Sequence, residues 1–84
     1  MKKHDNPLAH WLRDATAEDR ERLATLAGTG VNYLFQLAAG RREPKVQLAF
    51  AIEEATKELC WETGGRLAIV TAREIAQIQA LSGL

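Results

Sequence analysis

The sequence is poor in cysteine, proline and aromatic residues, and its formal net charge is zero. The single cysteine, Cys60, has no partner for a disulfide within the chain, which excludes a disulfide-stapled secreted scaffold. No apolar run approaches the about 18 residues that a membrane-spanning helix needs. No basic and apolar leader precedes a small-residue cleavage site. We therefore expect a cytoplasmic protein that does not enter a membrane.

Residues suited to catalysis or metal binding are few and scattered. His4, His10 and Cys60 lack the spacing of a zinc site, which generally has four protein ligands or three and a water. Ser82 has no partner base nearby in the sequence for nucleophilic catalysis. We therefore expect no enzyme activity, no metal and no cofactor.

The length and apolar content bound the architecture. A chain of 84 residues with 46% hydrophobic residues can form one domain with one small core. We expect residues 1–5 to be frayed. Residues 60–84 form a tail that either mediates dimerisation or completes the core.

Capping signals mark where helices begin. Asn6-Pro7 combines a helix-capping side chain with a proline suited to the first helical position. Thr16 is the expected cap of the next helix, and Thr71 with Glu74 fits a capping box. With the spacing of the apolar residues, these signals predict a mainly α fold of four to five helices, over about residues 7–15, 17–27, 31–39, 44–59 and 72–81.

The run from Arg66 to Val70 has two interpretations. It is short and apolar, contains β-branched residues and follows Gly64-Gly65, the strongest break in the chain. A short strand and an extended arm both fit, because length alone does not distinguish them.

Residues 20–42, RERLATLAGTGVNYLFQLAAGRR, combine two short helices with a glycine-containing turn. Gly28 ends the first helix, because glycine accepts the left-handed conformation that a sharp turn requires. Leu34 and Leu37 face back onto the first helix, where the small Ala24 allows close approach. Two helices joined by such a turn are typical of a helix-turn-helix DNA-binding unit.

These residues, which end in Gly40-Arg41-Arg42, together with Pro44 resemble the Cro/repressor-type helix-turn-helix family, in particular the small Cro-like and YdaS-like prophage regulators. The likeness covers roughly residues 7–59, and Thr29 and Phe35 depart from the usual residue types. The resemblance implies a phage or prophage transcription regulator, such as a repressor. Such a regulator binds double-stranded DNA as a homodimer, on a pseudo-palindromic operator in the cytoplasm of a bacterial host.

The second helix of such a unit presents its N-terminal residues to base edges in the major groove. With Leu34 and Leu37 inward, the outward face holds the candidate base-contacting residues Val31, Asn32, Phe35 and Gln36. The amides of Asn32 and Gln36 suit adenine, and Val31 suits a thymine methyl group. Phe35 has two alternative roles, contact with DNA and packing in the core.

Basic residues near the helix pair are the candidate phosphate contacts. Arg41, Arg42 and Lys45 cluster after the second helix, and Arg20 lies at the start of the first. Residues 1–45 hold eight basic and six acidic residues, whereas residues 46–84 hold three and five. The positive charge therefore lies in the half that carries the helix pair.

The apolar tail has two possible roles. The candidate dimer-interface residues are Leu67, Ile69, Ile75 and Ile78, which offer a second copy more apolar surface than a solvated tail needs. Alternatively, they fold back and complete the core of one chain.

Two rival functions stay open. An antitoxin-like protein would keep DNA binding and also bind a toxin protein through its tail. A protein-interaction module would use the same fold without DNA, and the zero net charge favours it.

Overall fold

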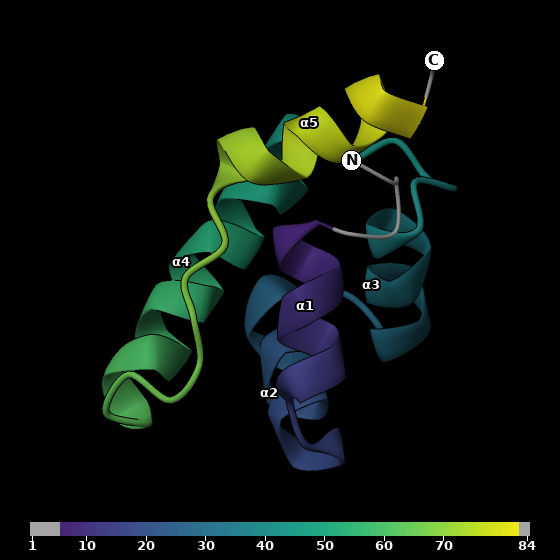
Figure 1. Ribbon diagram of the computed structural model, residues 1–84. Coiled ribbons are helices and arrows are strands. Elements are labelled where there is room, and N and C mark those ends of the chain that lie inside the picture. The colour runs from purple at the N-terminus through teal and green to yellow at the C-terminus, as the bar shows by residue number, and fades with distance from the viewer. Residues whose placement is uncertain (1–5, 83–84) are drawn as a thin grey trace.

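The structure, a computed structural model, describes residues 6–82. Five helices follow one another, and no strand occurs among these residues (Figure 1). The helices are α1 (Pro7–Asp14), α2 (Ala17–Ala27), α3 (Val31–Ala38), α4 (Val46–Glu62) and α5 (Ala72–Ser82). The mainly α fold class is thus confirmed, and α4 begins and ends two to three residues later than predicted. The predicted frayed segment 1–5 lies outside the described residues.

The predicted caps form the expected hydrogen bonds. The Asn6 side chain accepts from the Ala9 backbone N–H at 2.9 Å, and Pro7 takes the first helical position. Thr16 and Asp19 form a reciprocal capping box at the start of α2. Thr71 and Glu74 do the same at α5, through two backbone–side-chain hydrogen bonds of 2.9 and 3.2 Å.

Glycines end α2 and α3 in the same way. Gly28 has a φ of 74° and Gly40 a φ of 75°, in the left-handed region that favours glycine. The backbone N–H after each glycine turns back to a helix carbonyl, from Thr29 to Ala24 and from Arg41 to Gln36, at 2.9 Å in both cases. The Gly40 turn thereby brings Arg41 and the residues after it back towards the end of α3.

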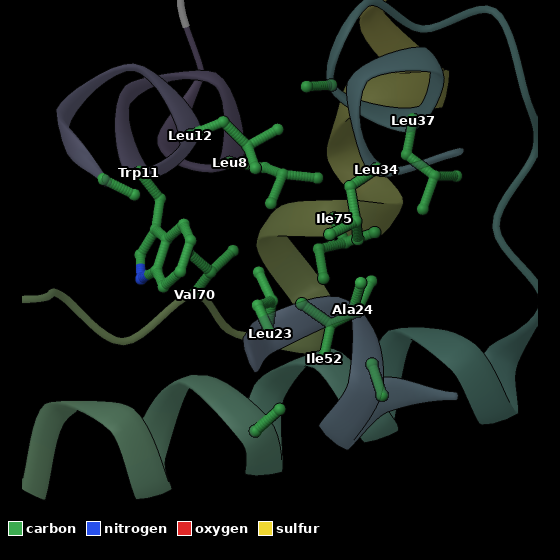
Figure 2. Packing of buried hydrophobic residues seen from close by; sticks show 14 of the residues in the cluster. Leu8, Trp11, Leu12, Leu23, Ala24, Leu34, Leu37, Ile52, Val70 and Ile75 are labelled. Atoms are coloured by element: carbon green, nitrogen blue, oxygen red, sulfur yellow. The ribbon is translucent and has the colours of Figure 1, made fainter. Parts of the chain in front are cut away.

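One core joins all five helices. α2 packs against α3 and α4, while α1 and α5 both contact α3 and each other. Figure 2 shows side chains from every helix pointing into a common interior. The largest fully buried apolar side chains are Leu8, Leu12, Leu23, Leu34, Leu37, Ile52, Val70 and Ile75. Fully burying one side chain of this size contributes about 1.5–3 kcal/mol, so the loss of any one of them is costly in a small domain.

The connecting segment, residues 63–71, runs between α4 and α5 without forming a strand. The Trp11 indole N–H donates to the Ala68 carbonyl at 3.0 Å, which ties the segment to α1. The Thr56 hydroxyl accepts from the Val70 N–H at 3.0 Å, which ties it to α4. The strand interpretation of residues 66–70 is therefore wrong, and side chains of α1 and α4 satisfy backbone groups of this segment instead.

The four predicted dimer-interface residues differ in how deeply they are buried. Leu67, Ile75 and Ile78 lie in the interior of the chain's own core, and only Ile69 is exposed. The core-completing alternative is therefore correct for these three residues, because α1 to α4 leave one side of their shared interior for the tail to cover. A dimer contact made by Ile69 stays a prediction.

Candidate nucleic-acid interface

The buried side of α3 fixes which of its side chains face outward. Leu34 and Leu37 are fully buried, and Ala24 of α2 is buried where the two helices meet. Asn32 and Phe35 are consequently exposed, and Gln36 is half-buried. Val31 is also half-buried and packs against the core. The outward face named from the sequence is therefore present, with Val31 at its edge.

Gln36 is oriented by a basic neighbour. Its side-chain oxygen accepts a hydrogen bond of 2.8 Å from Nε of Arg42, six residues later and beyond the Gly40 turn. An amide oxygen has two lone pairs, so it can accept a second hydrogen bond while its NH₂ group donates. The pair therefore presents an amide whose rotation is restricted and whose donor group stays usable.

The Phe35 ring is neither buried in the core nor fully exposed to solvent. Its side chain is 45% exposed, and the Arg20 guanidinium lies over the ring at 5.6 Å from the centroid. Nε of Arg20 also donates to the Leu12 carbonyl at 2.7 Å, so this guanidinium is held between α1 and α3. Phe35, Ala38 and Ala39 line a hollow of about 370 Å³ with residues of α1. Arg20 is therefore a fixed positive charge beside an apolar ring.

The loop between α3 and α4 carries the other predicted basic residues. Arg41, Arg42 and Lys45 are all exposed, and one acidic residue, Glu43, lies among them. Lys45 is the residue immediately before α4, at its N-terminal cap. With three cations and one anion, this exposed loop is locally basic, as a phosphate contact requires.

The link between Gln36 and Arg42 was missed at the level of sequence. The sequence predicts that Arg42 contacts phosphate, which stays a prediction, whereas in the structure its Nε holds the side chain of Gln36, a candidate base-reading residue. The available signal was Gly40, because a left-handed residue after a helix folds the next residues back over the last turn.

Among the described residues, no group of three or more His, Cys, Asp and Glu side chains is arranged to hold a metal ion. In the same part of the chain, none of the helices is both long and apolar enough to cross a membrane. Cys60 is half-buried on α4.

Comparison with known proteins adds no assignment: no protein-family model, curated protein or solved structure matches this chain.

Proposed function

We propose that this chain is a sequence-specific DNA-binding transcription regulator that places the outer face of α3 in the major groove. α2, the Gly28–Gly30 turn and α3 would form its helix-turn-helix of the Cro/repressor type. The observation that carries the proposal is the outer face of α3, which carries Asn32 and Gln36 and is joined to the basic loop by the hydrogen bond between Gln36 and Arg42.

Each part of this surface has a chemical role in the proposal. Asn32 and Gln36 read adenine N6 and N7, since amides match that donor and acceptor pair. Arg41 and Lys45 hold phosphate oxygens and set the register of α3 without reading sequence. Arg42 does both, by contacting phosphate and restraining Gln36. Because the outer face of α3 holds no cation of its own, A·T pairs are the expected targets.

One module of this size reads few base pairs, so the proposed regulator acts as a homodimer on two related half-sites. The number of basic residues sets the scale of non-specific binding. Few neutralised phosphates give a shallow to moderate dependence of affinity on salt.

Selection of binding sites from a random pool of duplex DNA, at physiological salt, tests this function. We expect an enriched A·T-containing sequence with a repeated half-site. Gln36→Ala is expected to lose that enrichment, whereas Gln77→Ala, an exposed glutamine on α5, keeps it. A pool that yields no sequence bound better than bulk DNA would refute the proposal.

A second candidate is a protein-interaction module with the same helices and no DNA partner. The zero net charge and the exposed Phe35 ring favour it, since apolar exposed rings are typical of protein contacts. A failed selection, together with an intact fold, would favour this second candidate.

A further inference from the structure

The outer face of α4 carries a stripe of four exposed residues: Phe50, Glu54, Lys57 and Trp61, called here the α4 stripe. Phe50 is 56% exposed and Trp61 is 87% exposed, although both are large aromatic side chains. The opposite side of α4 is buried, through residues that include Ala49, Ile52 and Leu59. Aromatic side chains are enriched in protein–protein interfaces relative to the rest of the surface, so these two make α4 a candidate contact surface.

The spacing within the α4 stripe is that of a helix-pairing seam. Its members are four, three and four residues apart, which is the alternation of the a and d positions in a coiled coil. Such a seam stays on one side of a helix over three turns, so it can contact another helix along its length.

The α4 stripe is complementary to itself when two copies run antiparallel. A two-fold axis on the exposed side of α4, level with Ala55 and Thr56 along the helix, places Phe50 opposite Trp61 of the second copy. The same axis places Glu54 opposite Lys57 of the second copy. Every contact occurs twice, as a closed two-fold interface requires, and the two ion pairs lie between the two aromatic pairs.

The charges select this arrangement over its alternatives. A parallel pair sets Glu54 against Glu54 and Lys57 against Lys57, and like charges across an interface are unfavourable. If the antiparallel pair is shifted by about one turn, Glu53 of each copy lies opposite Glu54 of the other copy. In the same register, Phe50 of each copy lies opposite Lys57 of the other. Only the register with Phe50 opposite Trp61 pairs aromatic with aromatic and acid with base.

Hollows flank the α4 stripe at both ends. Beside Phe50 lies a mainly apolar hollow of about 410 Å³, lined partly by Ala49, Ala72 and Ala76. Beside Trp61 lies one of about 520 Å³, next to Leu26 and Ala51. The two-fold axis brings the Trp61 ring of the second copy towards the hollow beside Phe50, where small alanine side chains leave room for an indole.

Within one chain, Lys57 already pairs with Glu53 at 3.3 Å and Glu54 at 3.4 Å. These contacts raise the pKa of Lys57, so the amine is charged at neutral pH. The side chain of Glu54 is largely exposed and that of Lys57 is half-exposed, so re-pairing them across two copies costs little.

We propose that two copies of this chain associate through the α4 stripe, as an antiparallel helix pair. The proposal supplies the second copy that the proposed function requires, and in that respect rests on it. Its test contains no DNA, so either proposal can fail while the other stands.

The mass of the DNA-free chain, measured by sedimentation equilibrium from micromolar to millimolar concentration, tests the association. We expect a dimer, and Trp61→Ala should raise its dissociation constant about tenfold or more, because it removes the largest apolar side chain of the interface. Phe35→Ala, which removes an exposed aromatic from α3, is the matched control and should leave the constant unchanged. A single-chain mass at every concentration, or equal effects of the two variants, overturns the proposal.

A charge exchange tests the register. Glu54→Lys and Lys57→Glu should each weaken the dimer at low salt, because each leaves like charges opposed. The double variant restores opposite charges and should return the dissociation constant to near that of the parent. Circular dichroism of each variant checks that the helices persist. A double variant as weak as the worse single variant overturns the antiparallel register.

Discussion

Arg66 and Asp19 form a two-pronged ion pair that joins the connecting segment to the start of α2. Both guanidinium NH₂ groups donate to the carboxylate, each at 3.0 Å. The Asp19 carboxylate also accepts from the Thr16 backbone N–H at 2.9 Å, as part of the capping box. One nearly buried carboxylate therefore stabilises a helix start and a segment that follows it by more than forty residues.

The Asp19 pair makes stability dependent on pH in the acid range. The Arg66 guanidinium and, secondly, the Thr16 N–H lower the pKa of Asp19 from 3.8 to about 2. Because the folded-state pKa is the lower one, this stabilisation is fully present above about pH 4 and is lost as the pH falls towards 2. Urea unfolding across this range measures the loss.

Asp19→Asn removes the charge and keeps a capping oxygen. Because Arg66 is half-exposed, we expect a cost of about 1 kcal/mol at neutral pH and a flatter acid profile. Asp14→Asn, at an exposed carboxylate on α1, is the control and should change stability by less than about 0.5 kcal/mol. An Asp19→Asn profile as steep as the parent's would contradict this account.

Thr56 provides the second test of the connecting segment. Its hydroxyl is fully buried, accepts from the Val70 N–H at 3.0 Å and lies 2.9 Å from the Glu53 carbonyl oxygen. Thr56→Val keeps the shape and leaves the Val70 N–H without its acceptor, at an expected cost of about 1–3 kcal/mol in the free energy of unfolding. Thr25→Val, at an exposed threonine of α2, should be nearly neutral. Equal effects of the two variants would rule out a structural role for the Thr56 hydroxyl.

Comparing variants of Arg41 and Arg42 distinguishes phosphate contact from the positioning of Gln36. Arg41→Ala should weaken binding to selected and random DNA alike and reduce the salt slope by about 1. Arg42→Ala should show the same loss and, in addition, about a tenfold loss on selected DNA only, because Gln36 is no longer held. Titration of both variants on both DNAs measures the difference. Identical losses would remove the positioning role from Arg42.

Gln36→Ala should weaken binding to selected DNA by about 1–3 kcal/mol and leave binding to random DNA nearly intact. In this background, Arg42→Ala should cost only its phosphate contact, so the double-mutant cycle measures the coupling between the two residues. Additive losses on selected DNA would mean that the 2.8 Å hydrogen bond has no part in binding.

The features predicted correctly from the sequence are local ones. Asn6, Thr16 and Thr71 each satisfy backbone N–H groups within three residues, so their neighbours alone identify them as caps. Gly28 follows the same logic, because the turn needs a left-handed residue at that position. The inward side of α3 also followed from spacing alone, through Leu34 and Leu37.

The features that were missed depend on distant partners. The spacing of apolar residues in the tail is consistent both with a dimer surface and with the core, because it does not reveal whether the first four helices close their own interior. In the structure the core contains Leu67, Ile75 and Ile78. The segment at residues 66–70 has the composition of a strand, yet its backbone forms hydrogen bonds with side chains on α1 and α4. The role of Arg42 required the three-dimensional course of the chain after Gly40.

Burial of the tail also has a consequence for synthesis. Leu8 at the start of α1 and Ile78 near the end of α5 share one core. As the chain leaves the ribosome from its N-terminus, α1 to α4 emerge before Leu67, Ile75 and Ile78, which cover their shared apolar interior. We therefore expect α1 to α4 to expose apolar surface during synthesis until these three residues have also emerged.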